Sequence, residues 1–296
     1  MLWFQALVLG LLQGLTEFLP VSSSGHINGV PYLVGWEPGS VTFDVMVHGG
    51  TLVAVIAYFR TDLWFLATRS LGLLGSTVGE QRLARRTLVL LAVGSVPAAA
   101  AGLLFESTFE AAFADVRWIA GFLYLTALLL VSAELLRRRR VATELGKSVR
   151  ELDRRQRHRD PGRHEGTTTV RDATGIGVAQ ALAIFPGVSR SGATIAAGMA
   201  LGLSRSGAAR FSFLLSIPVI FGATVYKLPD LGAVEPGTAP FGGPEILIGV
   251  VAAAISGYWA IRFLLRLVQV QDLLGFARYV AGFATLLLFA SLFVIG

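Results

Sequence analysis

The chain has 296 residues, of which 54% are hydrophobic and only 15% are charged. So few polar residues do not cover a water-soluble globule of this length, and the composition indicates a helical membrane protein with several spans. The absence of cysteine excludes disulfides, thiolate metal sites and cysteine nucleophiles. The net charge of +6 does not indicate nucleic-acid binding, because twelve of the 25 Lys and Arg residues lie within residues 137–171.

Six apolar segments are each close to the about 20 residues that a helix needs to cross a bilayer. They cover residues 41–59, 86–104, 116–136, 207–226, 244–265 and 276–295. Two shorter elements accompany them. Residues 61–75 predict a short interfacial helix, and residues 144–159 are predicted either as an amphipathic surface helix or as a solvated linker.

Residues 2–35 and 173–204 differ from these six segments. Each consists of two short apolar stretches separated by Pro20 or Pro186 and a Ser/Gly cluster. We predict a re-entrant hairpin for each, because broken backbone at membrane depth persists only where protein or a wet cavity satisfies it. A kinked spanning helix is the alternative.

A sequence repeat relates the two hairpins. At a constant offset of 167, residues 13–25 match residues 180–192 at seven positions of the first copy, namely Gln13, Leu15, Phe18, Val21, Ser22, Ser24 and Gly25. Two Gly/Pro-interrupted apolar segments at corresponding places in two halves indicate a polar site at the repeat interface. Glu17 and His26 occur only in the first copy, and Arg190 only in the second.

The positive-inside rule gives the orientation of the loops. Loops 60–86 and 137–172 carry five and twelve Lys or Arg residues, and together with 262–278 they are predicted to be cytoplasmic. Loop 105–115 carries none and loop 227–243 carries one, so both are predicted to lie outside. The first hairpin then enters from outside and the second from inside.

The predicted fold is therefore all-α, with six transmembrane helices and two re-entrant helical hairpins in an inverted-topology repeat. Residues 1–136 form the first repeat, residues 137–172 a basic cytoplasmic linker, and residues 173–296 the second repeat. The expected location is the cytoplasmic membrane of the cell, crossed several times.

The first copy carries the more reactive side chains. Gln13 and Glu17 are four residues apart and share a helix face. A Glu at membrane depth is costly and indicates a functional site. Pro20 precedes a helix start whose first turn holds Ser22, Ser23, Ser24 and Gly25, and the exposed N–H groups and hydroxyls there predict an anion cradle that His26 completes.

The second copy offers a complementary set. An Arg at the tip of an intramembrane hairpin needs an anion, and its planar fork suits phosphate. Around it lie further predicted phosphate-binding residues, namely Ser189, Ser191, Gly192 and Thr194. If the two tips meet near the midplane of the membrane, Arg190 faces residues 22–26 of the first copy, and together they form a pocket for an amphiphile with a phosphorylated head group.

Asp44 and His48 are also four residues apart, at the start of the 41–59 segment. We predict that their shared face lines the cavity, with the pair supporting the first hairpin rather than reacting.

Two motifs resemble the signatures of the undecaprenyl-pyrophosphate phosphatase family, also called the bacitracin-resistance protein family. They are Gln13-x-x-x-Glu17-Phe18-Leu19-Pro20-Val21-Ser22-Ser23-Ser24-Gly25-His26 and Pro186-Gly187-Val188-Ser189-Arg190-Ser191-Gly192-Ala193-Thr194. The resemblance implies a membrane phosphatase that converts undecaprenyl pyrophosphate to the monophosphate and so recycles the lipid carrier of cell-envelope glycan synthesis. It also implies a catalytic set of Glu17, Ser23, His26 and Arg190, and a divalent cation, Mg²⁺ or Ca²⁺, near Glu17.

Many members of that family carry Glu where this chain has Gln13. The sequence leaves open whether Ser23 or His26 is the nucleophile. The expected partners are a polyprenyl pyrophosphate lipid and the membrane, with no nucleic acid and with a homodimer left open. A polyprenyl-phosphate flippase is the alternative function, because inverted repeats are typical of transporters.

Overall fold

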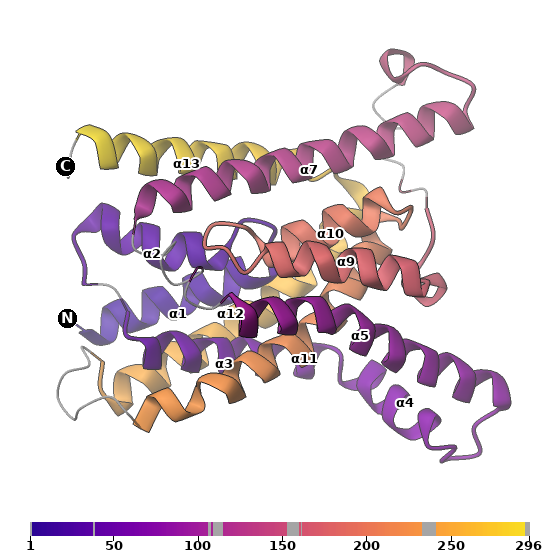
Figure 1. The fold of residues 1–296 in the computed structure, drawn as a ribbon, viewed down its shortest axis with the longest axis horizontal. Helices are drawn as coiled ribbons and strands as arrows, with labels where there is room; N and C mark the ends of the chain where they lie inside the picture. Colours follow the sequence, from indigo (N-terminus) through magenta and orange to yellow (C-terminus); the bar gives the residue numbers. More distant parts are fainter. Residues whose placement is uncertain are drawn as a thin grey trace.

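The computed structural model describes residues 2–293 apart from residue 38 and residues 106–107, 109–114, 153–159, 161 and 233–240. Over this part of the chain the secondary structure is helical, without strands (Figure 1). Five helices are long and apolar enough to cross a membrane: α5 (Val78–Leu104), α7 (Val116–Glu144), α11 (Arg205–Gly232), α12 (Gly243–Val270) and α13 (Leu274–Phe293). These helices confirm the predicted multi-pass membrane protein.

A sixth candidate span is bent. Helix α3 (Val41–Tyr58) turns by 71° into the short helix α4 (Arg60–Ser70), and the two pass as one span only when taken together. The predicted short helix at 61–75 is thus confirmed as α4, with slightly different bounds. Its turn away from α3 places α4 beside α5.

Helices α5, α7, α11 and α12 extend beyond their predicted ends, α5 and α7 the furthest. Helix α5 begins at Val78 rather than at residue 86, because Thr77 and Glu80 form a capping box in which Thr77 Oγ1 accepts from the Glu80 N–H at 3.2 Å. Helix α7 continues through four arginines to Glu144 rather than ending at residue 136. Arginine is a good helix former, so the basic run continues the helix.

The surface helix considered for residues 144–159 does not form in the described part of that segment. Residues 145–148 are turn and irregular backbone, followed by the single 3₁₀ turn η1 (Val149–Glu151), and residues 153–159 lie outside the described chain. Of the predicted external loops, residues 106–107 and 109–114 of loop 105–115 and residues 233–240 of loop 227–243 lie outside it as well, whereas residues 227–232 belong to α11.

Two pairs of shorter helices occupy the predicted hairpin segments. The first pair is α1 (Leu2–Phe18) and α2 (Ser23–Val34), and the second is α9 (Val170–Leu182) and α10 (Arg190–Ala200). In each pair the second helix starts at a serine cap: Ser22 Oγ accepts from the Gly25 N–H at 3.2 Å, and Ser189 Oγ accepts from the Gly192 N–H at 3.0 Å. The two caps are 167 residues apart, as the sequence repeat predicts.

Each short pair packs on a long helix of the other half of the chain. Helix α1 lies along α12, and α9 lies along α5. The last long helices of the two halves, α7 in the first and α13 in the second, lie side by side (Figure 1). Glycines allow the close approach: a Cβ added at Gly10 would lie 2.3 Å from the Gly249 carbonyl oxygen, and one at Gly177 would lie 2.5 Å from that of Gly94. Gly10 and Gly177 are again 167 residues apart, so equivalent contacts interlock the two halves.

The sequence did not predict a buried charge cluster at the ends of α7 and α11. Glu134 Oε2 accepts from Arg137 at 2.7 Å, and Glu134 Oε1 accepts from the Leu273 N–H at 3.0 Å. Asp160 caps the start of α11 by accepting from the Arg205 and Ser206 N–H groups at 2.6 and 3.2 Å. This cluster fixes the basic segment to the helix bundle.

Candidate active site

The two hairpin tips are in direct contact. The Gly187 N–H donates to Ser24 Oγ at 3.1 Å, and Ser191 Oγ donates to the Leu19 carbonyl oxygen at 2.9 Å. Ser24 and Ser191 are equivalent positions of the repeat, and each reaches the break in the opposite hairpin. The two tips therefore meet, as the predicted pocket requires, but Arg190 bonds Glu17 there rather than one of residues 22–26.

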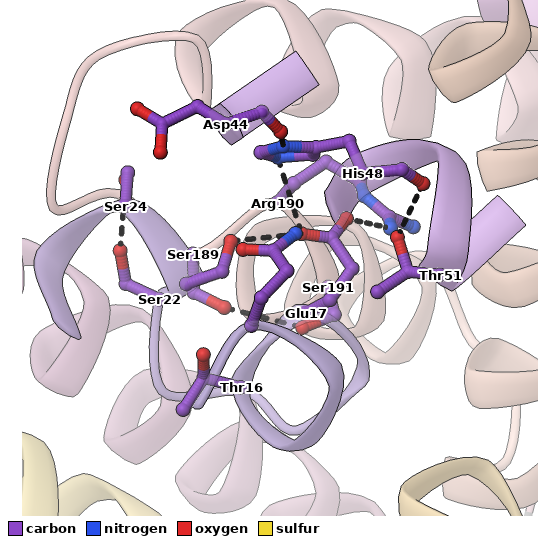
Figure 2. Close-up of polar contacts among 12 residues, drawn as sticks. Thr16, Glu17, Ser22, Ser24, Asp44, His48, Thr51, Ser189, Arg190 and Ser191 are labelled. Carbon is purple, nitrogen blue, oxygen red and sulfur yellow. Dashed lines mark hydrogen bonds and ion pairs between the residues drawn. The ribbon is translucent and has the colours of Figure 1, made fainter. Parts of the chain in front are cut away.

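A buried ion pair joins the two copies of the repeat. Arg190 Nη2 donates to Glu17 Oε1 at 2.7 Å, and the side chains of Glu17 and Arg190 are only 7% and 14% exposed (Figure 2). Arg190 Nη1 makes a longer contact, 3.4 Å, to the Ser212 carbonyl oxygen on α11. The charge found only in the first copy is thus neutralised by the charge found only in the second.

Three further side chains lie close to the other carboxylate oxygen of Glu17, Oε2. Ser23 Oγ donates to Glu17 Oε2 at 2.8 Å, and Gln13 Nε2 donates to it at 3.2 Å. His48 Nε2 lies 3.8 Å from the same oxygen. Because Ser23 lies past the helix break, its contact brings the start of α2 back onto the last turn of α1. Glu17 is therefore positioned to accept the Ser23 proton.

His26 faces a different part of the protein. Its Nδ1 lies 2.7 Å from the Ser22 carbonyl oxygen, which only accepts, so Nδ1 carries the proton. Nε2 then accepts from the Tyr279 hydroxyl at 2.8 Å, and the ring stacks on Phe283 with centroids 4.3 Å apart. Ser23 and His26 are therefore held by different partners, although they are three residues apart in one helix.

The hydroxyls predicted to bind phosphate all have partners within the protein. Ser22 and Ser189 cap their helices and also contact Ser24 and Ser191 at 3.3 and 3.2 Å. Thr194 Oγ1 donates to the Arg190 carbonyl oxygen at 2.8 Å. These residues shape the backbone around the ion pair, and phosphate contact by them or by the glycines Gly25 and Gly192 stays a prediction.

The backbone at both breaks adopts unusual conformations. Ser22 has φ 74°, which costs a non-glycine residue about 1–3 kcal/mol and is typical of functional sites. Gly187 has φ 97°, and a Cβ there would lie 2.4 Å from the Ile119 carbonyl oxygen. The close approach of α7 to the second tip therefore requires glycine at this position.

Thr126 on α7 is a contributor that the sequence did not reveal. It is fully buried; its Oγ1 donates to the Gly187 carbonyl oxygen at 3.0 Å and accepts from the Ser189 N–H at 2.9 Å. One threonine hydroxyl thus holds the backbone on both sides of Val188, and the second of these residues, Ser189, directly precedes Arg190. A lone threonine in an apolar span gives no local signal of such a role, and neither does Tyr279 in α13.

Asp44 and His48 lie beside the site, but only the His48 side chain is directed toward Glu17. His48 Nδ1 donates to the Asp44 carbonyl oxygen at 2.7 Å, which directs Nε2 toward Glu17. The Asp44 carboxylate points away from Glu17 (Figure 2). The imidazole therefore belongs to the site, whereas Asp44 contributes mainly its backbone.

The chain matches known proteins over nearly its whole length. The family described as "Bacitracin resistance protein BacA" matches residues 6–286. A protein named undecaprenyl-diphosphatase from Pelobacter propionicus is 40% identical over 278 residues, which cover 93% of this chain and 92% of that protein. The protein of the same name from Geobacter sulfurreducens is 42% identical over 286 residues, which cover 95% of this chain and 96% of that protein. Undecaprenyl-diphosphatase 2 from Stutzerimonas stutzeri is 41% identical over 297 residues, covering 97% and 98%.

Proposed function

The chain belongs to the bacitracin resistance protein BacA family, and we propose that it is an integral membrane phosphatase that hydrolyses undecaprenyl diphosphate to the monophosphate and inorganic phosphate. The observation that carries the proposal is the buried Glu17–Arg190 pair with Ser23 on the same carboxylate. The monophosphate product is the lipid carrier of cell-envelope glycan synthesis.

Arg190 binds the diphosphate. It gives Glu17 a single short hydrogen bond and Ser212 a weak one, so most of its five N–H donors remain for a phosphate group. The guanidinium also stabilises the negative charge that builds up on the transferred phosphoryl group. Around the site the hairpin helices are apolar, which suits a substrate with a long isoprenoid tail.

Ser23 is the nucleophile in this proposal and Glu17 is its base. Ser23 Oγ attacks the terminal phosphorus while its proton passes to the Glu17 carboxylate, and the bond to the bridging oxygen breaks to release the monophosphate lipid, which takes the proton from Glu17. Water then attacks the phosphoserine and gives a proton to Glu17. The bond from phosphorus to Ser23 Oγ breaks, Ser23 Oγ takes the proton back from Glu17, and inorganic phosphate leaves. The 2.8 Å Ser23–Glu17 contact supports this pair, whereas both ring nitrogens of His26 are engaged elsewhere.

A divalent cation, Mg²⁺ or Ca²⁺, completes the proposal. Within the described residues, Gln13 Oε1 is buried without a hydrogen-bond partner, on the helix face that carries Glu17. Oxygen donors of this kind suit hard cations, which proteins often hold through one carboxylate and the phosphates of the substrate. Glu17 and Gln13 would hold the cation, which would neutralise part of the diphosphate charge.

The membrane arrangement follows from the same features. Equivalent contacts at Gly10 and Gly177, and at Ser24 and Ser191, support six spans and two re-entrant hairpins in an inverted repeat. The arginine-rich loops would lie in the cytoplasm, and the first hairpin would enter the cytoplasmic membrane from outside.

Phosphate release tests the proposal. Purified full-length protein in lipid nanodiscs should release phosphate from undecaprenyl diphosphate, and an Arg190→Ala variant of equal thermal stability should not. Movement of the lipid across a liposome bilayer without phosphate release would instead support a flippase and contradict the proposal.

A further inference from the structure

His48 and Glu17 present two facing acceptor atoms with a gap between them. The Asp44 carbonyl oxygen accepts at 2.7 Å, so His48 Nδ1 carries a proton, and whenever the ring is neutral Nε2 has a free lone pair. That nitrogen lies 3.8 Å from Glu17 Oε2, which is too long for a hydrogen bond. Two such atoms repel one another unless a positive group lies between them.

The geometry of His48 is that of a metal-binding histidine. Such a histidine donates its second ring N–H to a carboxylate or a backbone carbonyl, which fixes the tautomer and the direction of the ligating nitrogen. The Asp44 carbonyl has this role for His48. Thr51 Oγ1 in turn donates to the His48 carbonyl oxygen at 2.8 Å on the same helix, so the backbone that carries the imidazole is held as well.

Gln13 supplies a third donor atom. Its side chain is fully buried, and its Oε1 has no hydrogen-bond partner among the described residues. A half-turn of the amide would exchange Nε2 and Oε1, and so place the oxygen about where the nitrogen now lies, 3.2 Å from Glu17 Oε2. With bonds of about 2.1 Å, ligands on one cation lie roughly 3.0 Å apart as neighbours and roughly 4.2 Å apart when opposite.

We propose that Gln13 Oε1, Glu17 Oε2 and His48 Nε2 form a mixed oxygen and nitrogen site for the divalent cation. The two oxygens suit Mg²⁺ or Ca²⁺, and the imidazole lets transition-metal cations such as Mn²⁺, Co²⁺ or Zn²⁺ bind there as well. Nowhere in the described chain, this site included, do three His, Cys, Asp or Glu side chains come together as a ligand set, so the third ligand here has to be the Gln13 amide oxygen.

The diphosphate completes this site, and in that respect the inference rests on the proposed function. Glu17 and Arg190 alone carry one negative and one positive charge, which gives a divalent cation little attraction. A bound diphosphate adds negative charge and further oxygen ligands, so cation and diphosphate bind cooperatively.

Pulsed electron paramagnetic resonance of bound Mn²⁺ tests the inference directly. The probe is Mn²⁺ with methylenediphosphonate, which is not hydrolysed, added to the purified full-length protein. We expect nitrogen coupling from a directly bound imidazole, which changes to the ¹⁵N pattern when histidine is ¹⁵N-labelled. His48→Gln should abolish the coupling and weaken Mn²⁺ binding at least about 10-fold. His164→Gln, which removes an exposed histidine far from the site in the sequence, should change neither.

Two results would overturn the metal site. One is that Mn²⁺ and methylenediphosphonate bind to the wild-type protein but Mn²⁺ shows no nitrogen coupling. This measurement does not depend on the folding of any variant. The other is a failure of the wild-type protein to bind Mn²⁺ at all. Phosphate release from undecaprenyl diphosphate that persists in EDTA would contradict the site and leave the phosphatase standing. Nitrogen coupling without any phosphate release would contradict the phosphatase and leave the site standing.

Discussion

Arg190 Nη2 lies 2.7 Å from Glu17 Oε1, so the two charges that distinguish the copies of the repeat neutralise one another at the point where the copies meet. Both side chains are nearly inaccessible to solvent. An uncompensated charge at such a position is costly, and removal of one partner of a buried pair typically costs about 3–5 kcal/mol. The pair therefore couples the fold of the two halves to the chemistry of the site.

Replacing Arg190 with Lys should reduce kcat/KM at least about 10-fold. A Lys ammonium group cannot bond Glu17 and a phosphate group at the same time as the planar Arg guanidinium does. The loss of one charged hydrogen bond costs roughly 1.5–3 kcal/mol. Steady-state phosphate release measures the effect. Arg262→Lys on α12 is the matched control and should behave like the wild type. Near-normal turnover of the Arg190→Lys variant would show that the arginine is structural.

Ser23→Ala should abolish turnover, whereas Ser24→Ala should retain most of it, because Ser24 holds the Gly187 backbone rather than Glu17. A Ser23→Ala/Glu17→Gln double variant should be little worse than Ser23→Ala alone, since residues that act as one unit are not additive. Rapid-quench detection of a phosphoserine checks the step. If His26→Ala is inactive while Ser23→Ala turns over, His26 is the nucleophile instead.

Thr126→Val should lower kcat about 10-fold, because it leaves the buried Ser189 N–H and Gly187 carbonyl without partners, each at a cost of roughly 1–3 kcal/mol. Thr126→Ser should restore activity, because it keeps the hydroxyl. The control is Thr68→Val, since the Thr68 hydroxyl bonds only within its own helix, to Trp64 and Phe65 carbonyl oxygens. Equal activity of the Val and Ser variants at position 126 would show that the hydroxyl does not position Arg190.

Gly10→Leu should destabilise the protein, because its first side-chain atom would lie 2.3 Å from the Gly249 carbonyl oxygen. Overpacking of this kind costs typically about 1–3 kcal/mol, and it should lower the midpoint of thermal unfolding in detergent. Gly121→Leu on α7 is the matched control, because a Cβ there meets no atom within 4 Å. Equal stability of the two variants would contradict the close packing of α1 on α12.

Cysteines introduced singly at Val78 and Gly243 test the orientation in a chain that has no native cysteine. An impermeant thiol reagent applied to whole cells should label the Gly243→Cys protein and leave the Val78→Cys protein unlabelled until the cells are opened. The arginines beside Val78 belong on the cytoplasmic side, whereas the segment before α12 carries little positive charge. The reverse pattern would invert the proposed topology.

The sequence by itself determined which segments form long apolar helices, where the two shorter helix pairs break and which charges lie at the breaks. These properties are local: span length follows from continuous apolar residues, and each break follows from a proline beside a serine cap. The constant offset of 167 also predicted that the two tips correspond, and the caps at Ser22 and Ser189 agree with it.

Only the tertiary structure decided which side chains meet across these elements. Helical spacing placed Ser23 and His26 on one face, yet Ser23 bonds Glu17 across the break and His26 bonds Tyr279, 253 residues away. Thr126 and Tyr279 lie in long helices that are mainly apolar in their spanning part, and no local pattern distinguishes them from the other polar residues there. Their roles depend on how distant helices pack, which is set by contacts such as Gly10 on Gly249 rather than by the sequence around each residue.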